Sequence, residues 1–176
     1  MHNLYVAGID GIDIGQQDTS ENTDDPSKFC IVIKKRAFGI NEPQYVAVYK
    51  DRPDDVRDAY KIAMCLIMYY KAIANIEATK IGMLTWAKQK KFFNYFMARP
   101  DATYPAGTQS RKKTVGTPAT PAVIDHQTDL IRDYVNDSGH TIWFEDMLDE
   151  LMRYTDENKT HFDIVAAMGM AELADE

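Results

Sequence analysis

The sequence predicts a single α/β domain built around a mixed sheet. Three short apolar runs open the chain, a long helical pattern and a fourth apolar run follow, and helical patterns make up most of the remainder. Consecutive strands followed by βα alternation are typical of a sheet with both antiparallel and parallel strands. With 176 residues, the chain is long enough for one domain with a sizeable core and too short for two ordinary ones. We therefore assign residues 1–176 to one domain.

The first three strands are expected at residues 4–9, 29–35 and 45–49. The first is a short apolar run that ends at Asp10, and the polar, turn-rich segment 11–28 after it is typical of an exposed loop. The second is rich in β-branched residues, and turn residues separate it from the third. Short turns between such runs predict an antiparallel meander.

Helical spacing of apolar residues governs most of the remaining chain. It predicts helices at 53–70 and 83–97, and between them the run 72–76 predicts a fourth strand that ends directly before Glu77. Three further helices are expected near the C-terminus, at residues 120–136, 145–154 and 161–173.

The charge of the chain limits how it can contact nucleic acid. The formal net charge is −7 and the sequence pI is about 5.1. A passive DNA-coating module needs a basic face to neutralise phosphates, so this composition argues against one. A metal-dependent nuclease can be acidic, because its carboxylates gather cations and those cations meet the phosphate.

The apolar and cysteine patterns argue against a membrane span and a structural zinc site. No apolar run approaches the roughly 20 residues that cross a bilayer, so no membrane association is expected. Cys30 and Cys65 both fall in apolar segments and predict buried free thiols in a reducing compartment. The chain has no CxxC pair.

Three acids occupy positions from which a rigid scaffold can present oxygens into one cleft. Asp10 leaves the first strand, Glu77 leaves the fourth, and Asp163 lies in the first turn of the last helix. Mg²⁺ and Mn²⁺ are hard cations that take oxygen ligands. Two such ions about 3.5–4 Å apart can activate water and stabilise the leaving oxygen of a phosphodiester. We therefore predict that these acids bind metal and are catalytic.

Each acid also has an ordinary structural explanation. An Asp after a strand is most often a turn residue or a helix cap, and a single Glu at a strand end is more often solvated. Asp163 can simply stabilise a helix N-terminus. No one of the three indicates a metal site alone, so the hypothesis depends on their order along the chain.

Three segments around these acids carry a resemblance to a known family. Residues 5–10, YVAGID, form a strand that ends in Gly-hydrophobic-Asp; the aromatic pair at 69–70 precedes a strand that ends at Glu77; and residues 161–163, HFD, open the last helix. Over nearly the whole chain, this pattern resembles the C-terminal nuclease domain of the large terminase subunit of tailed phages. In that family the last motif is similar to His-Asp-Asp.

The chain departs from the family pattern at two positions. The paired acids of the last motif are Phe162 and Asp163 here. Asp13 is therefore the natural candidate for a further metal ligand, because it lies in the same loop as Asp10 and some relatives have a second acid there. The Asn often found after the Glu is Ala78, so no such side chain contributes a contact.

The resemblance implies an RNase H-like fold with a central mixed five-stranded sheet, in which three antiparallel strands are followed by parallel strands and helices flank the sheet. It implies an endonuclease that uses two Mg²⁺ or Mn²⁺ ions to cut concatemeric phage DNA during packaging, in the host cytoplasm. Large terminases also carry an ATPase, and this chain has no GxxxxGK[ST] P-loop. We therefore expect the nuclease domain of a larger terminase, with double-stranded DNA, the ATPase domain, the portal and the small terminase subunit as partners.

A basic triplet is the main candidate for direct DNA binding, whereas Lys88, Lys90 and Lys91 are expected to form an ordinary solvated helix face. Arg111, Lys112 and Lys113 lie in an irregular, glycine-flanked segment, which predicts a contact to the DNA backbone beside the cleft. A solvated loop is the alternative. His161 is expected to cap the last helix or support a metal ligand rather than act on the leaving group.

Two other functions remain open at this stage. A Holliday-junction resolvase or a 3′–5′ exonuclease also presents acids from an RNase H-like sheet. A non-catalytic interaction domain would use the same acids only as caps and turn residues. The products formed from DNA distinguish a resolvase or an exonuclease from a terminase-like nuclease. The absence of any metal effect would indicate an interaction domain.

Overall fold

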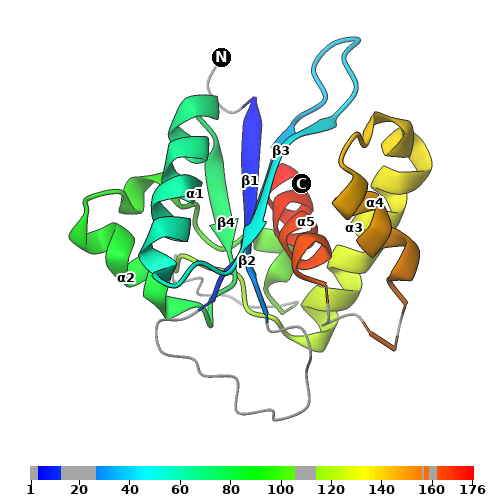
Figure 1. Cartoon of the computed structure of the whole chain (residues 1–176). Helices are drawn as coiled ribbons and strands as arrows, with labels where there is room; N and C mark the ends of the chain where they lie inside the picture. The colour runs from blue at the N-terminus through cyan, green and yellow to red at the C-terminus, as the bar shows by residue number, and fades with distance from the viewer. Residues whose placement is uncertain (1–3, 13–26, 106–113, 156, 159–161) are drawn as a thin grey trace.

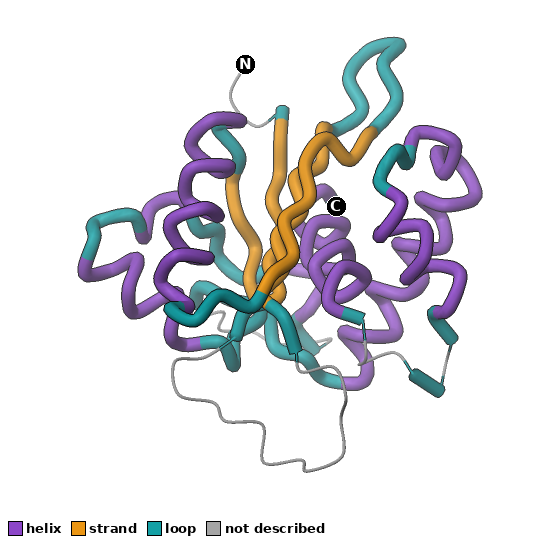
Figure 2. The backbone as a smooth tube through the Cα atoms, viewed as in Figure 1, coloured by secondary structure: helices purple, strands orange, loops and turns teal. Residues whose placement is uncertain are grey.

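Four strands form one mixed sheet in the order β3-β2-β1-β4, and five α-helices pack around it (Figures 1 and 2). The computed structural model describes residues 4–12, 27–105, 114–155, 157–158 and 162–176. This arrangement confirms the predicted α/β class and the predicted mixture of antiparallel and parallel pairing.

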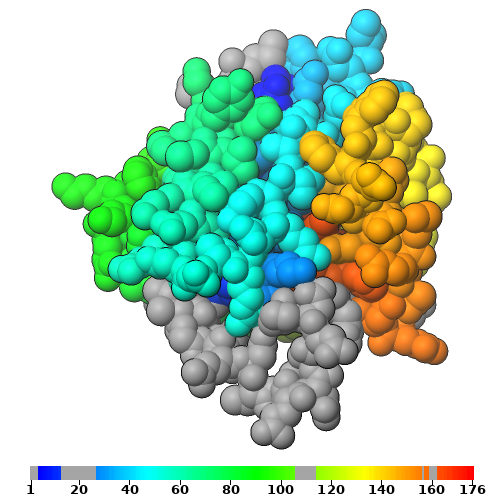
Figure 3. Space-filling model, viewed as in Figure 1, coloured from blue at the N-terminus to red at the C-terminus, as the bar shows by residue number. Residues whose placement is uncertain are grey.

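The first three strands form the predicted antiparallel meander. β1 (Tyr5–Asp10) pairs with β2 (Phe29–Lys35), and β2 pairs with β3 (Gln44–Asp51). β2 is buried along almost its whole length, because it lies between two strands and is covered on both faces. β3 is one edge strand of the sheet, and most of its side chains are partly exposed, in the cyan region of the space-filling view (Figure 3).

β4 (Ile73–Ile76) extends the sheet on the other side of β1 and runs parallel to it. The resemblance implied five strands, and the described residues form four. At the outer edge of β4, isolated parallel bridges join Ala74 to Phe96 and Glu77 to Thr117. In the part of the chain that the structure describes, these two bridges take the place of the expected fifth strand.

The helices divide between the two faces of the sheet (Figure 1). α1 (Val56–Tyr70) and α2 (Ile81–Gln89) share one apolar core with the sheet. The other face carries α5 (Asp163–Asp175), and α3 (Pro121–Ser138) and α4 (Glu145–Arg153) pack on α5. Short 3-10 turns fill the connections, at Phe93–Tyr95, Asp101–Thr103 and Gly139–Thr141.

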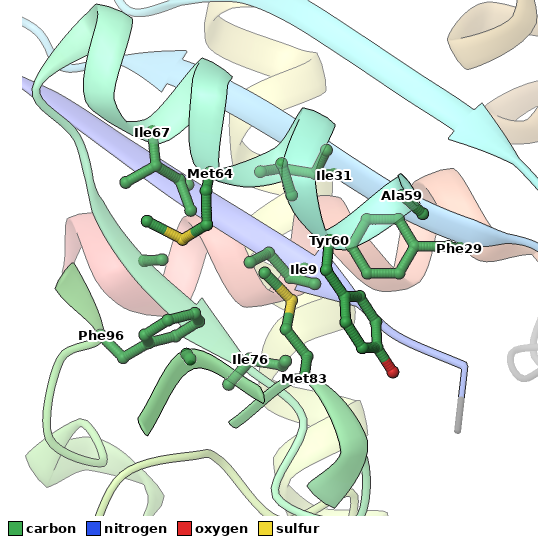
Figure 4. Packing of buried hydrophobic residues seen from close by; sticks show 14 of the residues in the cluster. Ile9, Phe29, Ile31, Ala59, Tyr60, Met64, Ile67, Ile76, Met83 and Phe96 are labelled. Atoms are coloured by element: carbon green, nitrogen blue, oxygen red, sulfur yellow. The ribbon is translucent and has the colours of Figure 1, made fainter. Parts of the chain in front are cut away.

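Alternation along the strands builds the two cores. Ile9 and Ile31 point toward α1 and pack with Tyr60, Met64 and Ile67 of that helix (Figure 4). The intervening residues of β2 point to the other face and pack against α5. A sheet buried on both faces needs apolar residues at successive positions, which explains the continuous apolar run in β2.

Gly8 allows α5 to lie directly on β1. A Cβ atom built at Gly8 would lie 1.9 Å from the carbonyl oxygen of Ala167 and 2.4 Å from the nitrogen of Ala171. Any side chain there would therefore collide with the helix backbone. α5 begins beside the end of β1 and finishes beside its start, where the Arg36 guanidinium donates to the carbonyl of Ala174. This close, antiparallel packing carries the first turn of α5 to the same end of the sheet as Asp10.

Two sequence predictions are corrected by the structure. The helix predicted at 83–97 ends at Gln89, because Lys91 has a left-handed backbone (φ 63°) and Phe92 turns back onto Trp86, with ring centroids 6.0 Å apart. Both cysteines are free, but only Cys30 is buried. The prediction of a buried Cys65 is wrong, because that residue faces solvent from α1.

Candidate active site

The ends of two parallel strands bring Asp10 and Glu77 to the same edge of the sheet. Ile9 of β1 is in register with Ile76 of β4, so Asp10, the last residue of β1, and Glu77, the first residue after β4, lie at the same level. Parallel strands end at a common edge, and residues just beyond that edge can face one cleft. Strand register therefore brings these two acids together, as the sequence predicted.

Hydrogen bonds on both sides hold the backbone around Glu77. The Ala78 amide donates to the carbonyl of Thr117 at 2.8 Å, and the Thr117 amide donates to the carbonyl of Ile76 at 2.8 Å. The Thr117 hydroxyl donates to Asn75 Oδ1 at 2.7 Å, and Asn75 Nδ2 donates to a carbonyl of α5 at 3.0 Å. These bonds fix the end of β4 against both the following chain and α5.

Asp163 is the first residue of α5, and several groups surround its carboxylate. The Lys50 ammonium, from β3, lies 3.4 Å from Oδ2, and the backbone amide of Lys28 donates to the same oxygen at 3.3 Å. Burial raises the pKa of the Asp163 carboxyl above its ordinary value, while Lys50 and the Lys28 amide oppose the rise. Asp163 is thus partly buried and already has a cationic partner.

Glu150, from α4, caps the N-terminus of α5. Its Oε2 accepts hydrogen bonds from the amides of Ile164 at 2.9 Å and Val165 at 3.2 Å, and its Oε1 pairs with the Lys50 ammonium at 2.6 Å. The residue at the cap position of α5, Phe162, has no side-chain oxygen to do this. A carboxylate of the neighbouring helix α4 therefore stabilises the start of α5.

Asp10, Glu77 and Asp163 line one pocket, whose volume is about 150 Å³. Lys80 lies in the wall of the same pocket, as does Gln127 of α3. The three acids predicted from the sequence come from two strand ends and a helix start that are far apart along the chain. The fold brings all three to one cavity.

The electrostatics of this pocket are those of crowded carboxylates. Burial raises the pKa of the Asp10 carboxyl from its ordinary value of 3.8 to about 7. Lys80 opposes the rise, and the negative charges of Glu77, Asp163 and Glu150 add to it. Among the described residues, no hydrogen bond or ion pair reaches the Asp10 carboxylate. A cation that entered the pocket would find an uncompensated acid there.

The donor set suits a hard divalent cation, although the acids are not gathered into a finished metal site. Carboxylate oxygens from three elements are the ligand type that Mg²⁺ and Mn²⁺ prefer. Within the described residues, however, no group of three or more His, Cys, Asp or Glu side chains is close enough to hold a metal ion. Lys50 and Lys80 lie among the acids instead.

Several predicted residues lie outside the described residues. These are the possible fourth ligand Asp13, the predicted DNA contacts Arg111, Lys112 and Lys113, and His161. Their assignments therefore stay predictions.

Sequence reasoning missed three charged residues of this region: Lys50, Lys80 and Glu150. Lys80 follows Glu77 by one turn, which was a usable signal for a pocket residue. Lys50 lies near the end of an edge strand, and Glu150 lies in a helix with several exposed acids. Only the packing of α4 on α5 distinguishes Glu150 from those solvated neighbours.

Comparison with known proteins adds no family assignment. The sequence matches no protein-family model, and a search of curated proteins finds no significant similarity. Within the ranges that the structure describes, no helix combines the length and apolar character required to cross a membrane. A function must therefore be argued from the pocket itself.

Proposed function

We propose that this chain is a metal-dependent DNA endonuclease with an RNase H-like fold, and that it is the nuclease domain of a phage terminase large subunit. The observation that supports this proposal most is the convergence of Asp10, Glu77 and Asp163 on one pocket. The sheet order, with β1 central and parallel to β4, also suits a fold that presents acids from the ends of its central strands.

The three carboxylates would hold Mg²⁺ or Mn²⁺. Asp10 lines the pocket with both Glu77 and Asp163, and the charges of both add to the burial that raises its pKa, so it is best situated to share ions with each of them. When bound, two divalent ions would supply Lewis-acid activation of the attacking water and stabilisation of the leaving oxygen of a phosphodiester.

The protein's own contribution is to hold these acids in place. Backbone bonds to Thr117 fix the position of Glu77, and Glu150 fixes the helix that carries Asp163. Burial, and after it the like charges of the neighbouring acids, opposes full ionisation of Asp10 before a cation enters. We therefore expect weak metal affinity in the free protein and tighter binding when a DNA phosphate adds oxygen ligands.

The biological substrate in this proposal is concatemeric phage DNA, which the enzyme would cut during genome packaging. The support for this step is the sequence resemblance, carried by residues 5–10, Glu77 and residues 161–163. A terminase ATPase, the portal and the small terminase subunit would then be its partners in the assembly.

Digestion of supercoiled plasmid tests the proposal. The wild-type protein should nick or linearise the plasmid with Mn²⁺ or Mg²⁺ and should be inactive in EDTA. Asp10→Asn and Glu77→Gln should abolish cleavage while leaving the far-ultraviolet circular dichroism spectrum unchanged. Asp133→Asn is the matched control, because this acid is exposed on α3 away from the pocket, and it should cut at the wild-type rate.

The products distinguish the remaining possibilities. Activity restricted to branched DNA would indicate a junction resolvase, and stepwise release of nucleotides from 3′ ends would indicate an exonuclease. Cleavage that survives in Asp10→Asn would remove this residue from the catalytic role. A protein with no activity and no shift of its thermal midpoint with Mn²⁺ would have only an interaction role.

A further inference from the structure

Two lysines flank the acids of the pocket, and among the described residues only one of them, Lys50, forms ion pairs with carboxylates. Lys50 pairs with Glu150 at 2.6 Å and with Asp163 at 3.4 Å. Lys80 lines the pocket with Asp10, yet among the described residues its ammonium makes no ion pair and no hydrogen bond. One cation therefore completes a structural cluster, and the other is available to an incoming ligand.

The fold holds the stem of Lys80 beside the acids. Lys80 is the residue that precedes α2, and its amide donates to the carbonyl of Glu77 at 3.2 Å in the turn between β4 and that helix. A Cβ atom built at Gly11 would lie 3.2 Å from Lys80 Cβ and 3.5 Å from Cγ. The lysine stem thus packs over the residue that directly follows Asp10.

The charge balance of the pocket explains why such a cation matters. Lys80 is the lysine that lines the pocket together with Asp10, Glu77 and Asp163, so its ammonium is the positive charge that shares the pocket with all three acids. A DNA phosphate that approached Asp10, Glu77 and Asp163 would meet a surplus of negative charge. An ammonium with free donors can offset part of that repulsion and pair with a phosphate oxygen directly.

We propose that Lys80 binds a non-bridging oxygen of the DNA phosphate that enters the pocket. This inference rests on the proposed nuclease function and adds to it a substrate-contacting residue contributed by the chain itself. Lys80 would have a different task from Lys50, which keeps Glu150 and Asp163 in position. Lys80 is a catalytic residue in this scheme, because it touches the substrate.

The test is equilibrium binding of a short fluorescein-labelled DNA duplex, measured by anisotropy with Ca²⁺ in place of the catalytic metal, across a salt series. Lys80→Met should weaken binding several-fold at low salt, and the slope of log affinity against log salt should fall by about one, as expected for one lost phosphate contact. Lys80→Arg should retain most of the affinity. Lys80→Gln repeats the measurement if Lys80→Met fails to fold.

Lys71→Met is the matched control. It removes the same charge from an exposed residue that precedes β4, whereas Lys80 follows that strand, and it should leave both affinity and slope unchanged. If Lys80→Met keeps the wild-type affinity and slope while Asp10→Asn still abolishes plasmid cleavage, the role of Lys80 is wrong and the nuclease proposal stands.

Two further outcomes would also overturn the role of Lys80. Weaker DNA binding with an unchanged salt slope and a weaker thermal response to Mn²⁺ would show that Lys80 acts on metal affinity through Asp10, without touching phosphate. If the wild-type protein binds no duplex and cuts no plasmid, the role of Lys80 falls together with the proposed function.

Discussion

The two ends of α5 join the sheet through charged side chains, and the two ends are built in opposite ways. At the C-terminal end, the Lys34 ammonium lies 2.5 Å from Glu172 and 2.7 Å from Asp175. The Tyr45 hydroxyl donates to Glu172 at 2.5 Å. Lys34, Tyr45 and Glu172 are buried, and each has its partners within the protein.

At the N-terminal end, the charges do not cancel. Asp10, Glu77 and Asp163 line the pocket there, and the Asp10 carboxylate meets no hydrogen-bond donor among the described residues. Lys50 is shared between Asp163 and another carboxylate, so it cannot neutralise all of the acids. Burial, to which the charges of Glu77, Asp163 and Glu150 add, raises the pKa of Asp10 to about 7, although Lys80 opposes the rise.

The comparison shows how the same residue types can serve stability or chemistry. Buried charges that are paired and hydrogen-bonded fix one end of the helix, at a desolvation cost that their mutual attraction offsets. An acid without a partner, as Asp10 is among the described residues, costs stability, and this is the arrangement expected where a ligand supplies the missing charge. We therefore interpret the C-terminal end as an anchor and the N-terminal end as a binding site.

Breaking the anchor should have the largest effect on stability. Lys34→Met would leave Glu172 buried without its cation, and removal of one partner from a buried pair costs about 3–5 kcal/mol. Urea unfolding at neutral pH measures the loss. Plasmid cleavage per folded molecule should change little, because Lys34 lies at the opposite end of β2 from the pocket.

The double variant Lys34→Met/Glu172→Gln is the control for the anchor. Glutamine removes the uncompensated charge and still offers an oxygen to the Tyr45 hydroxyl, so most of the lost stability should return. If the double variant is as unstable as Lys34→Met, the cost comes from packing around Lys34 and not from its charge.

Removing the Asp10 carboxylate from the N-terminal end should raise the free energy of unfolding, whereas breaking the anchor lowers it. The folded protein holds the Asp10 proton up to about pH 7, whereas an ordinary Asp releases it near 3.8. The folded state therefore binds more protons between these values, and stability falls as the pH rises through this window. Asp10→Asn lacks that penalty, so above pH 7 it should be the more stable protein in EDTA.

The size and pH dependence of that gain are also defined. About three pH units correspond to about 4 kcal/mol, and this is an upper limit because the side chain is only partly shielded from water. Below about pH 4 the wild type and Asp10→Asn should unfold at the same urea concentration. Asp133→Asn should track the wild type at every pH. A gain that is equal at pH 4 and pH 8 would contradict the ionisation of Asp10 as its cause.

The sequence predicted the acids of the binding end because their positions follow from local patterns. An apolar run marks where a strand ends, so Asp10 and Glu77 could be assigned to strand ends without a structure. Asp163 followed from the start of a helical pattern. Their convergence then needed only the parallel pairing of β1 with β4 and the packing of α5 on Gly8.

The lysines and Glu150 could not be predicted in the same way. Their roles depend on which elements pack together, and one-dimensional periodicity carries no such information. The helix predicted at 83–97 failed for a related reason: Phe92 continues the apolar spacing, but it packs from a separate turn after the left-handed Lys91. Side-chain pattern alone does not reveal a reversal of the backbone.

The smallest effect is expected from Glu150. This residue has a structural role, because it caps the N-terminus of α5, and an electrostatic role, because it adds negative charge near Asp10. Glu150→Gln keeps one oxygen for the amides of Ile164 and Val165 but loses the charged bond to Lys50, so we expect a loss of about 1–2 kcal/mol in urea unfolding. Glu150→Ala should lose more, because the amides are then uncapped.

Asp149→Asn provides the control for Glu150, since this neighbouring acid on α4 is exposed and its loss should change stability by less than about 0.5 kcal/mol. Glu150→Gln should also change the pKa of Asp10. Without the charge of Glu150, the pKa of Asp10 should fall, so the pH window over which Asp10→Asn gains stability should move downward in a Glu150→Gln background. An unmoved window would mean that Glu150 serves only the anchoring of α5 and takes no part in the charge balance of the pocket.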